Sequence, residues 1–320
     1  MSKKAYEAQL AALDRLRDAD PAAAVEPLRK ALRNPSNYLV AKAATIAGEL
    51  GLRALIPDVL AALERFFTED DPQCWAKNAL VDAMAGFEHG DSELYLRGLK
   101  HVQMEPVWQG SVDTAGPLRA RCALALVSCK DLSDHRLLGH LIEVLVDTDK
   151  TVRVEAARAI GRVDRPEAAL LLRLRALTGD AEPEVIGACF QSLLGIDNAL
   201  GFVSRFLGSG GDIGAEAAIA LGLTRRPEAF TILKDQWERQ RDPLFGAALL
   251  SGIGLTNLPE AIDFLTAVVA ADGRGSTDAL QAFAGARLSE EVRARLQAAV
   301  EKTGNARLRA VWKKLSARGS

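Results

Sequence analysis

Pro166-Glu167-Ala168 recurs as Pro227-Glu228-Ala229 and as Pro259-Glu260-Ala261. Each copy begins five positions after a glycine that closes an apolar helical pattern, at Gly161, Gly222 and Gly254. Proline suits the first position of a helix because its missing N–H would be unpaired there, and the glutamate that follows is stabilised by the positive end of the helix dipole. The motif therefore predicts the start of the second helix in a repeated two-helix unit.

The same glycine position can be followed along most of the chain. It defines eight units, anchored at Gly48, Gly86, Ser128, Gly161, Gly195, Gly222, Gly254 and Gly285. The residue before each anchor is apolar throughout: Ala47, Ala85, Val127, Ile160, Leu194, Leu221, Ile253 and Ala284. The residue five positions before each anchor is also apolar: Ala43, Val81, Ala123, Ala156, Phe190, Ala217, Leu249 and Leu280. Positions four apart share a helix face, so these columns predict the buried stripe of each first helix. Nowhere does apolar residue alternation predict a strand.

One unit carries the pattern most clearly, in Val152-Arg153, Ala156-Ala157 and Ala159-Ile160-Gly161 followed by the first Pro-Glu-Ala. This unit resembles the HEAT-like repeat that is also found in phycobilisome lyases. The resemblance implies an all-α, right-handed α-solenoid of about eight two-helix repeats whose second helices line a concave face. We expect a single domain over residues 1–320, with an N-terminal cap at 1–35, repeats at 36–304 and a C-terminal cap at 305–320.

Composition limits the classes of function. The 320 residues contain 40 Lys+Arg and 42 Asp+Glu, a net charge of −2, so no global positive field exists to collect nucleic acid. The four cysteines form no CxxC pair, as expected for reduced thiols in a cytoplasmic protein. No apolar run approaches the roughly 20 residues of a membrane span. A nucleic-acid partner and a membrane are both disfavoured.

The longest interval between anchors, 42 residues from Gly86 to Ser128, contains a polar, helix-poor segment at 103–116. Long loops on a repetitive scaffold often carry binding residues, and this one holds Trp108, Asp113 and Thr114 shortly before Arg119. We predict that these four contact a protein or peptide partner. In the alternative, Trp108 folds back over the seam between repeats while Asp113 or Thr114 caps the next helix.

Cations recur on successive second helices, among them Arg173, Arg175 and Lys234. Such a stripe suits an acidic peptide or a phosphate backbone, although the acidic residues between them equally fit a mixed solvated surface. Trp237 lies among these charges. It is either an exposed anchor for a partner or part of the next repeat's core.

The sequence offers few candidate catalytic or metal-binding residues. His135 and His140 are five apart, which turns their rings to different helix faces, whereas a zinc site prefers spacings of three or four. We expect no catalytic residue, no metal and no cofactor, and hence no enzyme. The leading hypothesis is a non-catalytic scaffold that binds a partner on the concave face or the 103–116 loop. The alternatives rest on the HEAT-like resemblance and are a DNA glycosylase-like nucleic-acid binder and a bilin lyase-like enzyme.

Overall fold

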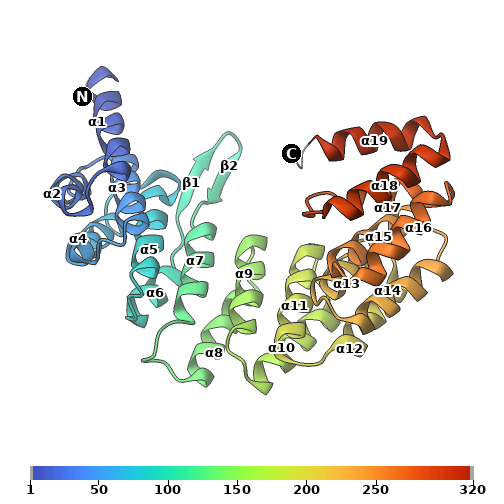
Figure 1. The fold of residues 1–320 in the computed structure, drawn as a ribbon. Helices are drawn as coiled ribbons and strands as arrows, with labels where there is room; N and C mark the ends of the chain where they lie inside the picture. The colour runs from blue at the N-terminus through green and yellow to red at the C-terminus, as the bar shows by residue number, and fades with distance from the viewer. Residues whose placement is uncertain (1–2, 318–320) are drawn as a thin grey trace. The chain divides into compact units, whose positions relative to one another are not determined.

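The computed structural model describes residues 3–317 and divides at Val163 into two compact units. In the first unit the helices are α1 (Lys3–Asp14), α2 (Pro21–Leu32), α3 (Asn37–Glu49), α4 (Ile56–Phe66), α5 (Trp75–Gly86), α6 (Ser92–Leu99), α7 (Gly116–Leu126), α8 (Asp134–Leu145) and α9 (Lys150–Gly161). The helices α3, α5, α7 and α9 pack against one another in chain order, and each even-numbered helix packs against the helix that follows it (Figure 1).

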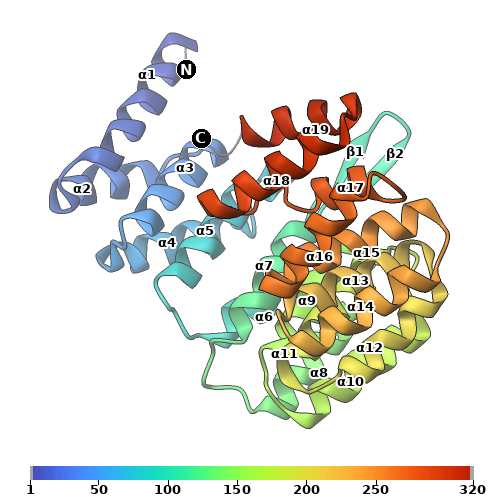
Figure 2. The same cartoon turned by 45° about the vertical axis from the view of Figure 1, so that its right-hand side comes forward.

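The second unit repeats this arrangement. Its helices are α10 (Pro166–Thr178), α11 (Pro183–Ile196), α12 (Leu200–Ser204), α13 (Gly211–Leu223), α14 (Pro227–Arg239), α15 (Pro243–Thr256), α16 (Pro259–Ala270), α17 (Ser276–Gln281), α18 (Glu290–Thr303) and α19 (Ala306–Ser316). Here α11, α13, α15, α17 and α19 pack in succession, with α10, α14 and α16 beside them (Figure 2). The fold is all-α and consists of HEAT-like helical pairs, as the sequence predicts.

The helix starts and the buried positions of the structure follow the repeat register predicted from the sequence at most positions. Helices α10, α14 and α16 each begin at the proline of a Pro-Glu-Ala motif, and the alanine of each motif is buried. The column five positions before the anchors is buried in all eight units. The column directly before the anchors is buried in five units, but Val127 is half-buried and Ala85 and Ala284 are exposed. These three lie at or beyond the end of their first helix, where the chain leaves the packed face.

Two anchor glycines allow close contact between helix backbones. A Cβ on Gly222 would lie 2.1 Å from the carbonyl oxygen of Gly252, and a Cβ on Gly254 would lie 2.6 Å from that of Ala282. Both distances are too short for real atoms, so α13, α15 and the chain after α17 approach each other only because glycine has no side chain. A Cβ on Gly86 or Gly195 would meet nothing within 4 Å, so at those positions the anchor has no such packing role.

The structure corrects one expectation about secondary structure. The sequence predicts no strand, yet the 103–116 segment forms a two-stranded antiparallel sheet of β1 (Met104–Val107) and β2 (Gly110–Asp113). Each strand has four residues, and Pro106 interrupts the first, so the alternation is too short to stand out. Among the described residues, no helix combines the length and apolar character that crossing a bilayer requires.

Candidate functional site

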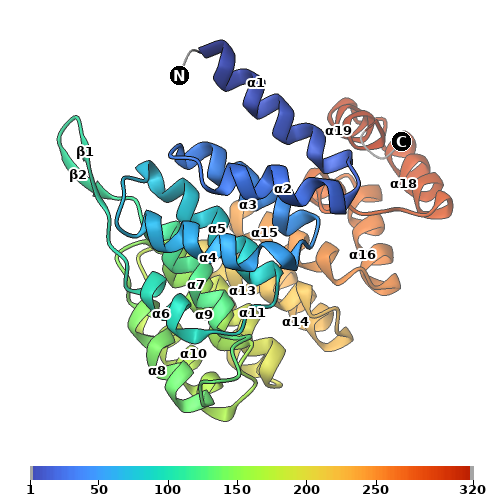
Figure 3. The same cartoon turned by 90° about the vertical axis from the view of Figure 1, so that its left-hand side faces the viewer.

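The β-hairpin occupies the long interval between α6 and α7. Trp108 and Gln109 form its turn, and Val107 pairs with Gly110 across it. Gly110 has a φ of +113°, which side chains with a Cβ rarely tolerate, so the turn depends on this glycine. Trp108 is 98% exposed at the tip. Figure 3 shows the hairpin projecting beyond the ends of the neighbouring helices of its unit. The alternative in which Trp108 covers a seam between repeats is therefore wrong.

A buried arginine fixes the base of the hairpin. Arg119 on α7 is 5% exposed, and its Nη1 donates to Asp113 Oδ2 at 2.6 Å and to the carbonyl oxygen of His101 at 2.9 Å. Its Nε and Nη2 donate to the two carboxylate oxygens of Asp147 at 2.8 and 3.0 Å. One guanidinium thus ties the start of the hairpin, its end and the α8–α9 loop together.

Asp113 is held in its charged form by this arrangement. Burial opposes ionisation, but hydrogen bonds from the backbone N–H groups of Gln103 and Ala115 and from Arg119 outweigh it and lower the pKa of Asp113. Burial also disfavours the charged form of Arg119, and its two carboxylate partners overcome this and raise the pKa of the guanidinium. The base of the hairpin is therefore an ionised network at neutral pH.

Glu105 joins the hairpin to the segment before α5. Its Oε1 accepts from Thr114 Oγ1 at 2.7 Å, from Gln103 Nε2 at 2.6 Å and from the backbone N–H of Gln73 at 2.6 Å. The Thr114 bond is the main cause that lowers the pKa of Glu105. Gln73 and Cys74 have φ values of 58° and 53°, a left-handed conformation that costs non-glycine residues energy. Glu105 binds the backbone at this strained position.

An open groove of about 840 Å³ lies between the hairpin and the helices α3, α5 and α7. Trp75 and Val112 line its apolar part, and both are nearly half exposed. Arg121 and Asp82 line its charged part and form an ion pair at 2.8 Å. Asn78 also faces the groove, and its buried Oδ1 has no hydrogen-bond partner among the described residues. The groove offers apolar surface with unused polar capacity, which is typical of a binding site.

Aromatic rings extend this surface toward the N-terminal cap. The ring centroids of Tyr38 and Trp75 are 5.2 Å apart, and those of Tyr6 and Tyr38 are 6.4 Å apart. Tyr38 is 40% exposed and Trp75 45% exposed. Three successive first helices, α1, α3 and α5, therefore present one continuous row of aromatic side chains that leads to the groove.

The predicted residues of the second unit are engaged within the fold. Arg173 pairs with Asp197 at 2.8 Å, and Arg175 pairs with Asp180, whose side chain is buried. Lys234 lies 3.9 Å from Glu238 and 5.6 Å from the ring centroid of Phe264. These three cations neutralise neighbouring carboxylates and do not form an unpaired stripe.

Trp237 is half-buried. Its ring meets Phe264 edge to face at 5.5 Å, and the guanidinium of Arg274 lies 4.4 Å from its centroid. Arg274 Nη2 also donates to the carbonyl oxygen of Trp237 at 2.6 Å. This tryptophan closes the seam between α14 and α16 and leaves only part of its surface for a partner.

The sequence predicts the same role, contact with a partner, for four residues that the structure places differently. Trp108 is free at the tip, whereas Asp113, Thr114 and Arg119 build the base and have their polar groups occupied. The sequence did not identify Glu105 or Trp75 as residues of the site. Glu105 carried a weak signal, as a carboxylate inside a functional insertion, but the contribution of Trp75 depends on long-range packing.

Metal and thiol chemistry find no support in the part of the chain that the structure describes. Within residues 3–317, no three His, Cys, Asp or Glu side chains gather closely enough to hold a metal ion. Burial raises the pKa of Cys74 and Cys129 to about 11 and of Cys189 to about 12, and it also raises the pKa of Cys122. All four are buried free thiols with little thiolate at neutral pH.

No protein-family model and no curated protein matches the sequence. Several solved structures match. The complex of CpcE and CpcF of phycocyanin lyase from Nostoc sp. PCC7120 is 18% identical, with 88% of this chain and 94% of that chain covered and a TM-score of 0.36. Human deoxyhypusine hydroxylase in complex with glycerol is 19% identical, with 94% and 91% covered and a TM-score of 0.29. An engineered protein is 16% identical, with 98% and 93% covered and a TM-score of 0.38.

These matches correct the expectation that the chain is not an enzyme. Two of the structures to which the chain is similar are those of a lyase and a hydroxylase, which are enzymes, and we withdraw that expectation. At identities below 20% the likeness concerns the fold alone, and it transfers neither reaction to this chain.

Proposed function

We propose that this chain binds a partner protein through the β-hairpin and the groove beside it. The observation that carries the proposal is Trp108, a tryptophan 98% exposed at the tip of a hairpin whose base is held by the buried Arg119. Tryptophan is the residue most enriched at the energetic centres of protein interfaces, where its large ring becomes enclosed.

The rigid base favours tight binding. Arg119 and Glu105 hold the two ends of the hairpin through seven hydrogen bonds at 2.6 to 3.0 Å. A partner therefore would not need to order the hairpin when it binds. Binding to a surface that is already ordered avoids roughly 0.5–1.5 kcal/mol for each mobile side chain that would otherwise be immobilised.

Local charge favours a protein over a nucleic acid at this site. Arg121, the cation among the groove residues, is paired with Asp82, and Arg119 is buried between Asp113 and Asp147. The hairpin itself contributes Glu105 and Asp113 and no cation. Phosphate groups would meet paired or negative side chains there, whereas an apolar protein surface meets Trp108 and Val112.

Site-specific photo-crosslinking in the native cell tests the proposal. A photo-reactive amino acid replaces Trp108, and in a second variant it replaces Leu244, which is 85% exposed on α15 and serves as the control. We expect a discrete adduct with one protein from position 108 that is absent from position 244. The same diffuse set of adducts from both positions would contradict a dedicated surface.

Once the partner is identified, affinity provides the quantitative test. Trp108→Ala is expected to weaken binding by about 2 kcal/mol or more, which corresponds to a roughly 30-fold rise in Kd. Leu244→Ala should leave the Kd unchanged. A Trp108→Ala variant that binds as tightly as the parent chain would remove the hairpin from the interface.

A further inference from the structure

The C-terminal helix α19 carries a concentrated positive charge that the near-neutral composition conceals. Its sequence, ARLRAVWKKLS, contains four cations and no acidic residue. The four are Arg307, Arg309, Lys313 and Lys314, which we call the α19 basic face. All are exposed, and none has a carboxylate partner among residues 3–317. Many other surface cations of this unit are paired, as Arg295 is with Asp263.

Helical periodicity separates these charges from the apolar side of α19. Leu308, Val311, Trp312 and Leu315 follow the spacing i, i+3, i+4, i+7 and share one face, and Leu308 is fully buried. The four cations lie outside this apolar stripe and extend over about 10 Å of helix, from the rise of 1.5 Å per residue. The helix packs against α17 and α18 (Figure 2), and its four cations are exposed.

A hollow of about 720 Å³ opens beside this helix. It is lined by the 283–288 loop, by Arg293 of α18, and by Trp312 and Leu315 of α19. Arg287 adds a further exposed cation at its edge. The hollow therefore combines an indole ring, an aliphatic side chain and positive charge, next to the basic face.

We propose that the α19 basic face and this hollow form a second binding site, for an acidic segment of a partner protein that inserts one apolar side chain beside Trp312. Guanidinium and ammonium groups recognise carboxylates through charge-assisted hydrogen bonds, and the unpaired cations are free to do so. The hollow next to the charges exposes Trp312 and Leu315, which supply the apolar anchor that charge alone lacks. This site is independent of the hairpin.

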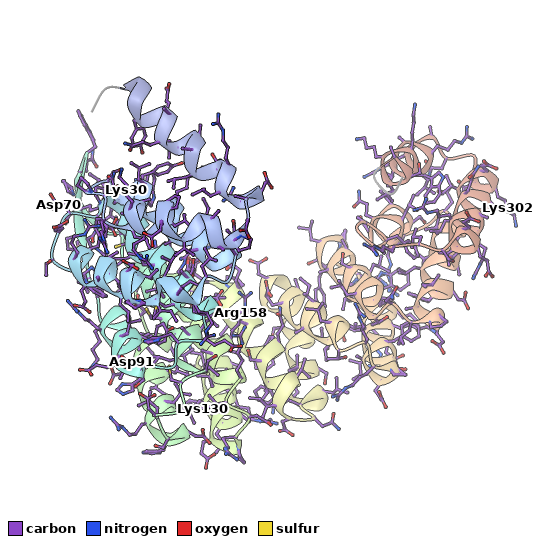
Figure 4. The ribbon with its side chains drawn as sticks, turned by 60° about the vertical axis from the view of Figure 1, so that its left-hand side comes forward. Lys30, Asp70, Asp91, Lys130, Arg158 and Lys302 are labelled. Atoms are coloured by element: carbon purple, nitrogen blue, oxygen red, sulfur yellow. The ribbon has the colours of Figure 1, made fainter. Side chains whose placement is uncertain are left out.

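The exposed acidic residues beside α19 favour a narrow ligand over a broad one. The neighbouring α18 exposes Glu290, Glu291 and Glu301, while Lys302 at its end lies on the outer surface (Figure 4). A flat anionic membrane or a broad nucleic-acid duplex would meet these carboxylates together with the cations and be repelled by them. A single extended segment can follow the basic face alone.

Fluorescence anisotropy with synthetic probes tests the site on the full chain. The probe is a labelled peptide of Asp and Glu residues around one central leucine, and its matched control has alanine in place of leucine. We expect the leucine peptide to bind more tightly, with an affinity that falls as salt rises. The double variant Lys313→Ala/Lys314→Ala should weaken the binding about fivefold to thirtyfold, from roughly 0.5 to 1 kcal/mol for each of two exposed ion pairs. Alanine favours helix, so α19 should persist.

The matched control removes two exposed, unpaired lysines elsewhere, with Lys100→Ala/Lys130→Ala, and changes the net charge equally. It should leave binding unchanged. Equal losses in both double variants, or equal binding of the leucine and alanine peptides, would overturn the proposal, because attraction would then be unspecific. Tighter binding to phosphatidylserine vesicles or to a DNA duplex, lost in Lys313→Ala/Lys314→Ala, would also overturn it in favour of those ligands.

Discussion

Replacing Arg119 with leucine gives the sharpest test of how the hairpin is held. The substitution keeps an apolar side chain as far as Cδ but removes the bonds to Asp113, Asp147 and the carbonyl oxygen of His101. The side chains of Asp113 and Asp147 are only 23% and 12% exposed, so water replaces the guanidinium poorly. Breaking a buried ion pair by removing one partner costs about 3–5 kcal/mol. Because both carboxylates retain some exposure, we expect about 3 kcal/mol.

The same helix provides the control. Arg121 also contacts an aspartate, Asp82, at 2.8 Å, but the two side chains are 38% and 56% exposed. An exposed pair contributes about 0.2–1 kcal/mol, so Arg121→Leu should cost less than about 1 kcal/mol. Urea denaturation followed by far-UV circular dichroism measures both changes in the free energy of unfolding. Equal losses in the two variants would refute the argument that burial of the Arg119 network sets its contribution.

At acidic pH, the free energies of unfolding of the parent chain and of Arg119→Leu should differ less. The folded-state pKa of Asp113 lies below its ordinary value, so its contribution to stability is fully present above about pH 4 and is lost as the pH falls through the folded pKa. Below that value a protonated Asp113 no longer needs the guanidinium. A gap in unfolding free energy that stayed constant from pH 7 to about pH 3 would contradict this linkage.

Three further perturbations probe the rest of the fold. Gln73→Gly should raise the free energy of unfolding by up to about 1 kcal/mol in urea denaturation, because glycine adopts the left-handed φ of 58° without strain while its N–H still reaches Glu105; a loss would show that the side chain matters more. Leu249→Ala should cost about 2–5 kcal/mol, because Leu249 is fully buried, whereas Leu244→Ala should stay within about 0.5 kcal/mol. The four cysteines should react with a thiol reagent only after unfolding, as absorbance will report, because burial raises every thiol pKa; rapid reaction of the folded chain would be incompatible with their burial.

The sequence contains most of the information that defines the repeats. Ala168 and Phe190 are buried where the repeat register places them, because a helix face recurs every three to four residues and is visible within one unit. The hairpin escaped prediction because Pro106 and Gly110 interrupt strands of four residues, so no period of two develops. Local pattern thus predicted the helices and failed where the element is short.

The site was only partly predictable for a different reason. The sequence made Trp108 a candidate because it lies on an insertion, and only the structure shows that its ring is exposed. Arg119 was chosen for the same site, yet it is buried, because its partners Asp113 and Asp147 lie 6 and 28 residues away and meet it only in the folded chain. The net charge of −2 is a sum over the whole chain, so it does not reveal that α19 contains four cations and no acidic residue.

The buried base and the exposed tip of the hairpin depend on each other. A tryptophan on a mobile loop would lose conformational freedom on binding, and that cost would reduce the affinity it confers. The Arg119 and Glu105 networks order the hairpin beforehand, but Arg119 does so by burying a charge whose desolvation is costly. An array that needed only to pack its helices would connect α6 and α7 with a few polar residues, as most repeats of this chain are connected. Under the proposed function, the cost of the buried network is offset by a Trp108 that is already in place when the partner binds.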